Sequence, residues 1–114
     1  MFARKVAVRL KPNSLEKFTT LMEQGILPWL RTQEGFLDMI LLSSPDSNEV
    51  QALSFWDHEA NAAAYNSSGY PAVIKSLEGL LDNAPLVKTY EIVSSTMERY
   101  ARARETTASF AATR

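Results

Sequence analysis

The residues of this chain best suited to chemistry are a histidine and an arginine on segments that also carry aromatic side chains. His58, the only histidine, follows Trp56 at the end of an alternating segment, and an imidazole can act as a base near neutral pH. Arg9 lies on another alternating segment and could hold the anion that such a base produces. We therefore assign His58 and Arg9 as candidate catalytic residues. The alternative for His58 is a solvated residue in the first turn of a helix.

Four aromatic residues are candidates for contact with a ligand. Trp56 offers a flat apolar surface for an aromatic molecule, or else packs as a structural residue at the end of a strand. Tyr65, Tyr70 and Tyr90 each combine an apolar ring with a hydroxyl group that can form a hydrogen bond. We expect Trp56 and these three tyrosines to bind a small apolar or aromatic ligand.

Composition and charge exclude several other classes of protein. The chain has no cysteine, which excludes disulfides, thiolate nucleophiles and cysteine-based metal sites, and we expect no metal site. Its net charge of −1 provides no basic surface for nucleic acid. No segment is apolar over a length that would span a membrane or form a signal peptide. We expect a cytoplasmic protein without a nucleic-acid or membrane partner.

The hydrophobic pattern predicts two copies of a strand, helix, strand unit. Strands are expected where apolar residues alternate or form short runs, and helices where they recur at helical spacing. The expected strands cover residues 2–10, 36–43, 49–56 and 86–94, and the expected helices 14–31, 58–66 and 70–81. Pro28 lies within the first helix, where it lacks a backbone donor and crowds the preceding turn. A kink or break is therefore expected at residues 25–28.

This order of elements predicts an α+β fold with a ferredoxin-like βαββαβ subunit and a four-stranded antiparallel sheet. Residues 1–95 form the expected domain. Residues 96–114 form a C-terminal tail, partly helical or disordered, whose four arginines and two glutamates carry too little net charge for a nucleic-acid arm.

The strand at residues 36–43 has apolar side chains on both of its faces. Strict alternation places Phe36, Ile40 and Leu42 opposite Leu37, Met39 and Leu41. Two helices can cover only one face of the sheet, and each large apolar side chain left in water would cost about 1.5–3 kcal/mol. An identical sheet from a second copy would cover the other face. We therefore predict a homodimer that pairs through its sheet faces.

The same features carry a resemblance to a known family. The order of elements, the Gly35-Phe36 entry to the second strand, and the phrase 54–57 (SFWD) followed by a helix and Tyr70 resemble the antibiotic biosynthesis monooxygenase type of dimeric α/β-barrel protein. The resemblance covers residues 2–94. It implies that two ferredoxin-like subunits pair into a dimeric α/β barrel. In that family some members oxygenate polycyclic aromatic phenols without metal or flavin, and others bind and degrade haem.

Two positions depart from the oxygenases that the chain most resembles. Those enzymes carry an asparagine four residues before the strand-end tryptophan and a tyrosine early in the next helix, where this chain has Ala52 and Ala62. Trp56 is the position that matches. The haem-degrading members carry a histidine in the second helix, where this chain has Lys75. The resemblance therefore disfavours haem cleavage.

Oxygenation without a cofactor requires a substrate that donates the electrons. The protein must take a proton from an acidic phenol, hold the anion and exclude water. We expect a cofactor-independent monooxygenase that acts on a small aromatic or polyketide-like phenol, with no bound cofactor. The alternative is a non-catalytic small-molecule-binding or regulatory barrel, and a haem protein ranks third.

Overall fold

The computed structural model describes residues 1–98 and 100. The strands are β1 (Phe2–Arg9), β2 (Phe36–Ser43), β3 (Glu49–Trp56) and β4 (Leu86–Glu91). The helical elements are α1 (Leu15–Leu21), the π-helical segment η1 (Met22–Ile26), α2 (Leu27–Leu30), α3 (Glu59–Ser68), α4 (Tyr70–Leu77) and the 3₁₀ segment η2 (Glu78–Leu80). The expectation for the C-terminal tail falls mainly on residues 99 and 101–114, which lie outside the described part of the chain.

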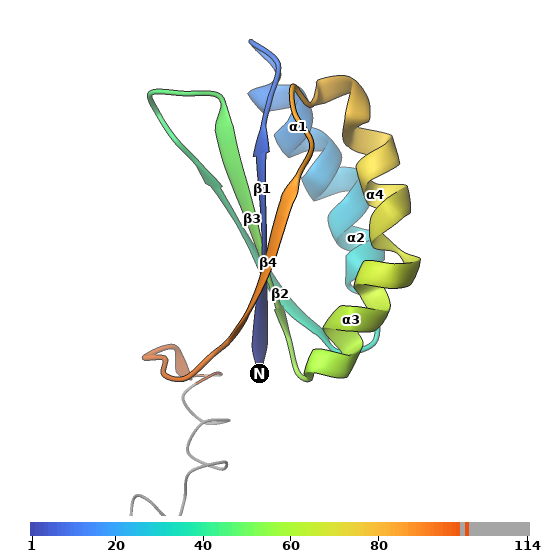
Figure 1. The fold of residues 1–114 in the computed structure, drawn as a ribbon, viewed down its shortest axis with the longest axis vertical. Coiled ribbons are helices and arrows are strands. Elements are labelled where there is room, and N and C mark those ends of the chain that lie inside the picture. Colours follow the sequence, from blue (N-terminus) through green and yellow to red (C-terminus); the bar gives the residue numbers. More distant parts are fainter. Residues whose placement is uncertain (99, 101–114) are drawn as a thin grey trace, which may run out of the picture.

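The four strands form one antiparallel sheet in the order β2-β3-β1-β4. The helical elements from α1 to η2 lie on one face of this sheet, as Figure 1 shows. The architecture is therefore the predicted α+β, ferredoxin-like fold. The hairpin of β2 and β3 has the predicted bounds, whereas β4 ends at Glu91 rather than at residue 94.

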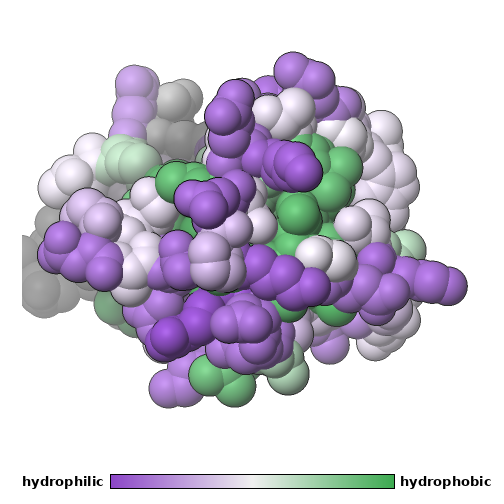
Figure 2. Space-filling view, turned by 90° about the horizontal axis from the view of Figure 1, so that it is seen from above, coloured by the Kyte–Doolittle hydropathy of each residue, from purple (hydrophilic) through white to green (hydrophobic). Residues whose placement is uncertain are grey.

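The main core lies between the sheet and the helices. Val6, Val8 and Leu10 face the helices from β1 and the residue after it, as the alternation predicted, and each is less than a tenth exposed. Phe18 and Met22 meet them from the first helical stretch. At the end of the molecule where β1 finishes, the surface is largely polar, with apolar atoms visible on the helix side (Figure 2).

The expected irregularity in the first helical stretch is a π-helical turn. The backbone N–H of Leu27 donates to the carbonyl of Met22, five residues earlier. In a regular α-helix the ring of Pro28 would crowd the carbonyl four residues before it, and the wider π-turn just ahead relieves that contact. The stretch therefore runs from Leu15 to Leu30 without a detached last turn.

A bulge in β2 corrects the assignment of two side chains. Phe36 pairs with Trp56 and Asp38 pairs with Phe55, so Leu37 is an extra residue in the ladder. The bulge moves Phe36 to the helix-covered face and Leu37 to the opposite face, the reverse of the prediction. After the bulge the alternation of the strand continues as predicted.

The sheet face opposite the helices, which we call the outer face, is covered in part by the same chain. Tyr100 stacks on Phe55 with ring centroids 5.2 Å apart, and its hydroxyl donates to the carboxylate of Asp38. Elsewhere on this face Ile40 and Leu42 are 40% and 46% exposed. Tyr100 thus covers one end of the outer face, and the homodimer through this face stays a prediction. None of the helices in the described residues is long and apolar enough to cross a membrane.

Candidate functional site

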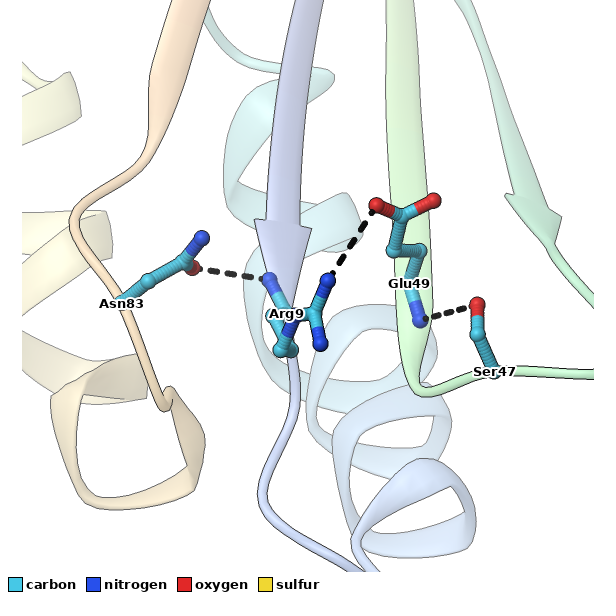
Figure 3. A network of polar contacts seen from close by, with 4 residues as sticks. All are labelled: Arg9, Ser47, Glu49 and Asn83. Carbon is cyan, nitrogen blue, oxygen red and sulfur yellow. Dashed lines mark hydrogen bonds and ion pairs between the residues drawn. The ribbon is translucent and has the colours of Figure 1, made fainter.

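Arg9 lies on the outer face, at the end of β1. Its guanidinium is 3.7 Å from the carboxylate of Glu49 on β3, and both side chains are more than half exposed. The backbone N–H of Arg9 donates to the side-chain oxygen of Asn83 at 2.9 Å. Figure 3 shows this contact and the ion pair, together with the backbone of Glu49, which donates to Ser47. Arg9 therefore has a local partner of opposite charge.

His58 is the exposed N-cap residue of α3. Its backbone N–H donates to the Asp57 side chain at 2.6 Å, and the same carboxylate oxygen accepts a bond from Asn61 at 2.8 Å. The Asn61 bond is the main cause that lowers the pKa of Asp57. Asp57 thus holds the residue before α3 and the first turn of that helix.

The two candidate catalytic residues lie at opposite ends of the sheet. Phe2 pairs with Trp56, next to His58, whereas Arg9 pairs with Glu49. At about 3.3 Å per residue, the seven steps from Phe2 to Arg9 span roughly 23 Å. The structure therefore does not bring Arg9 and His58 to one site within a protomer.

Trp56 and Tyr65 form one aromatic group in the core. Trp56 is fully buried, and its indole N–H donates to the Ser54 hydroxyl at 2.9 Å. Its ring stacks on that of Tyr65 with centroids 5.0 Å apart and meets Phe36 edge-on at 5.6 Å. Trp56 thus lies behind Tyr65 as a packed core residue. Tyr90 is separate, because it lies on the outer face with Lys5 5.7 Å from its ring.

A cavity of about 40 Å³ lies between the sheet and the helices. Most of its lining is aliphatic, from β1, the first helical stretch and α4. The polar groups in the lining come from Arg4, Ser54, Tyr65 and Tyr70. The structure thus brings Tyr65 and Tyr70, two of the three candidate tyrosines, together at the polar end of an apolar cavity.

Arg4 is the charged residue of this cavity, and it was not among the predicted site residues. Only 2% of it is exposed. Its guanidinium lies 4.0 Å from the ring centroid of Tyr70 and 5.1 Å from that of Tyr65, and one terminal nitrogen donates to the side-chain oxygen of Asn66 at 2.6 Å. The alternation of β1 contained the signal, because Arg4 shares the face of Val6 and its apolar neighbours.

Two buried polar atoms at this point have no hydrogen-bond partner among the described residues. They are the Nε of Arg4 and the hydroxyl of Tyr70. No carboxylate in the described chain lies within ion-pair distance of Arg4. Such groups are rare in protein interiors and mark a place where a ligand can complete the bonding.

An open groove lies beside the cavity and shares Arg4 and Tyr70 with it. The groove has a volume of about 530 Å³, within the range of small-molecule sites. It runs between α3, α4 and the edge strand β4. Its other lining residues are Glu59, Ala62, Ala63, Asn66, Val87 and Thr89. Arg4 and Tyr70 therefore stand between an interior cavity and a groove open to solvent.

Burial keeps the hydroxyl groups of this site protonated. It raises the pKa of Tyr65 to about 12, with the nearby charge of Arg4 acting in the opposite direction. Burial likewise raises the pKa of Tyr70 and lowers that of Arg4. An arginine still carries its charge at neutral pH. The site thus presents a cation and two phenol groups that can donate hydrogen bonds.

No three His, Asp or Glu side chains in the described part of the chain are grouped so that they could hold a metal ion. The polar groups of the cavity and the groove suit an organic ligand instead, because they combine one guanidinium, hydroxyl groups and an amide with apolar walls.

Residues 1–74 match the family model described as antibiotic biosynthesis monooxygenase. No curated protein matches the chain. Among solved structures, the chain is similar to a monooxygenase from the gene ActVA-Orf6 of Streptomyces coelicolor, in complex with the ligand Nanaomycin D. The TM-score is 0.72 and the identity 21%, over 84% of this chain and 90% of that chain.

Two further structures have the same fold. A protein of unknown function from Nitrosomonas europaea aligns with a TM-score of 0.70 and 18% identity, over 84% of this chain and 92% of that chain. A conserved protein from Methanosarcina mazei aligns with a TM-score of 0.65 and 18% identity, over 80% and 92% of the two chains. These structural likenesses show the fold.

Proposed function

The chain belongs to the antibiotic biosynthesis monooxygenase family, and from this premise we propose that it is a cofactor-independent monooxygenase acting on a small aromatic or polyketide-like phenol. The observation that carries the proposal is the buried, incompletely bonded Arg4, which lies between the apolar cavity and the groove of about 530 Å³. The Streptomyces coelicolor monooxygenase of the same fold was solved with Nanaomycin D, which supports a small-molecule ligand.

In the proposed reaction the substrate supplies all the electrons. An acidic phenol loses a proton, and the resulting anion donates electrons to O₂ at a ring carbon that carries hydrogen. One oxygen atom remains as a new carbonyl group and the other leaves as water, so that the phenol O–H, the ring C–H and O₂ become two C=O groups and H₂O. The positive charge of Arg4 stabilises the anion in a site of low dielectric, and the apolar walls keep water from the reacting carbon.

The groove contains one carboxylate that can take the proton. Glu59, at the start of α3, lines the groove together with Arg4 and Tyr70. A base has to come within hydrogen-bond distance of the proton that it removes. In this proposal Glu59 has the role that the sequence suggested for His58, and Arg4 the role suggested for Arg9.

Oxygen uptake with a panel of anthrone-like phenols tests the proposal. We expect the wild type to consume O₂, and Arg4→Gln and Glu59→Gln each to lower the rate about 100-fold. Glu78→Gln, which removes an exposed carboxylate on η2, is the matched control and should leave the rate unchanged. Absence of uptake with every phenol contradicts the proposal. Loss of uptake in Arg9→Gln and His58→Ala, but not in Arg4→Gln, would instead support Arg9 and His58 as the catalytic residues, as the sequence predicted.

A non-catalytic binding protein is the second candidate. Ala52 lines the cavity and Ala62 lines the groove, at the two positions where the oxygenases that the chain resembles carry asparagine and tyrosine. The site is thus wider and less polar there than in those enzymes. A ligand that raises the melting temperature without any uptake of O₂ would favour this candidate.

We also propose that the protein forms a homodimer through the outer face of the sheet. Ile40 and Leu42 on β2 and Leu86 on β4 leave apolar surface exposed there. Burial of such side chains contributes about 1.5–3 kcal/mol each. A second copy would bury the same residues on both protomers, as a two-fold interface requires.

A further inference from the structure

Arg4 is a buried cation without a counter-charge in the described chain. It is 2% exposed, and one of its terminal nitrogens donates to the neutral amide of Asn66. The rings of Tyr65 and Tyr70 cover faces of the guanidinium but supply no full negative charge. A buried charge is costly unless it is paired and hydrogen-bonded. Arg4 therefore lacks the anionic partner that a buried guanidinium requires.

The amide of Asn66 orients this cation toward the groove. The bond from Arg4 to Asn66, at 2.6 Å, ties one terminal nitrogen to α3 and leaves Nε without a partner. Both residues line the groove, and so does Tyr70, whose buried hydroxyl is also unpartnered. Two donors thus lie at one place at the side of the groove.

The walls of the groove fit a flat apolar body. Ala62 and Ala63 of α3 and Val87 of β4 form apolar surface, and the volume is about 530 Å³. Arg4 is the only cation among the lining residues, and Glu59 adds a negative charge. One cation opposed by one carboxylate suits a ligand with a single negative charge and disfavours a polyphosphate.

We propose that Arg4, oriented by Asn66 and assisted by Tyr70, is the receptor for the single oxyanion of a flat aromatic ligand that lies in the groove between α3, α4 and β4. The oxyanion is an ionised phenol, an enol or a carboxylate. This proposal names the ligand class for the proposed function. It rests on the proposed function only for the chemical reaction, because the anion can bind without catalysis. It also makes Asn66 a positioning residue for Arg4.

Asn66→Asp provides a test that changes charge with almost no change in shape. The new carboxylate would lie at hydrogen-bond distance from Arg4 and neutralise it. Ser67→Asp adds the same charge to the next residue of α3, which is exposed, and is the matched control. Arg4→Gln removes the cation itself, and circular dichroism checks that each variant is folded. If Arg4→Gln fails to fold, Asn66→Asp still decides the question.

The probes are 2-naphthoate and its neutral counterpart 2-naphthamide, with binding measured by calorimetry. We expect the wild type to bind the carboxylate at least about 10-fold more tightly than the amide. Asn66→Asp and Arg4→Gln should weaken binding of the carboxylate at least about 10-fold. Both variants should bind the amide with an affinity within about 3-fold of that of the wild type. Ser67→Asp should bind both probes like the wild type.

A second arm distinguishes the source of the oxyanion. 4-Nitrophenol is yellow when ionised, so a site for phenolate should lower its apparent pKa in the wild type and not in Asn66→Asp. A lowered apparent pKa of 4-nitrophenol assigns the site to phenolates. Binding of 2-naphthoate without that change assigns the site to carboxylates.

Three results would overturn the inference. They are equal binding of the amide and the carboxylate, unchanged carboxylate binding in Asn66→Asp, and an equal loss of both probes in that variant. Absence of O₂ uptake with anion binding intact would instead remove the proposed reaction and leave the anion receptor in place.

Discussion

The guanidinium of Arg4 lies 4.0 Å from the centre of the Tyr70 ring, while the buried hydroxyl of that tyrosine has no hydrogen-bond partner among the described residues. The guanidinium thus makes a cation–π contact with the face of the Tyr70 ring. The Tyr70 hydroxyl and Arg4 Nε remain available for hydrogen bonds to a ligand. In the proposed site, such an arrangement favours ligand binding at the expense of the stability of the free protein.

The first prediction follows from that balance. Arg4→Met should raise the free energy of unfolding by about 1 kcal/mol, because the cost of burying the cation, several kcal/mol, exceeds the ring contact of up to about 2 kcal/mol. The oxygen of Asn66 lies at the open groove, where water can replace the lost donor. Urea unfolding at neutral pH measures the change. A loss of 1 kcal/mol or more would identify Arg4 as a structural residue.

The second prediction concerns the close approach of α3 and α4 to Trp29. A Cβ atom at Gly69 would lie 2.4 Å from the Trp29 ring, whereas one at Gly79 would meet nothing within 4 Å. Gly69→Ala should therefore cost about 1–3 kcal/mol of unfolding free energy. Gly79→Ala, the matched control, should be neutral or stabilise by up to about 1 kcal/mol.

A double-mutant cycle identifies the cause of the Gly69→Ala effect. Trp29→Leu removes the ring that the new methyl group would meet, so the double variant should cost less than the sum of the two single changes by about 1 kcal/mol. Additive costs would show that the backbone at Gly69, and not the ring of Trp29, is responsible.

The sequence predicted the fold well because its turns and alternation are local signals. The polar run at residues 44–48 determined both arms of the hairpin, and β2 and β3 have the bounds predicted for them. The bulge at Leu37 has no such local signal, since an extra residue in a ladder depends on the partner strand. That is why Phe36 was assigned to the wrong face.

The site was less predictable, because the sequence prediction placed it on the face of β1 opposite Val6 and Val8, whereas the cavity lies on the helix-covered face. The prediction of Arg9 rests on its position on that outer face, whereas the alternation of β1 places Arg4 on the face of Val6 and Val8, toward the helices. A charged residue in phase with buried ones is the signal that could have found it. The contact with Asn66, 62 residues away, could not be read from either segment.

The third prediction is a loss of stability at alkaline pH. Burial raises the pKa of Tyr65 to about 12, against about 10 in an unfolded chain. Below pH 10 both states hold the proton. Between pH 10 and 12 the unfolded chain releases it and the folded protein does not, so stability falls as the pH rises. The loss from this residue is at most about 3 kcal/mol, and Tyr70, with a pKa raised in the same direction, adds to it.

Tyr65→Phe should make this fall less steep. Urea unfolding of the wild type and the variant at a series of pH values from 8 to 12 measures the two curves, and the stability difference between them should change only above about pH 10. Parallel curves over the whole series would show that the hydroxyl of Tyr65 titrates alike in the folded and unfolded states.

The last prediction tests the proposed homodimer. Sedimentation velocity at micromolar concentration should give a particle of twice the 12.7 kDa chain mass. Ile40→Glu should give the monomer, because a carboxylate on the exposed part of the outer face would be buried without a partner in the interface. Leu15 on α1 is exposed to a similar degree, 48% against 40% for Ile40, but lies outside the sheet, so Leu15→Glu is the matched control and should remain dimeric. A folded wild-type monomer would show that Tyr100 and the rest of the chain cover the outer face sufficiently.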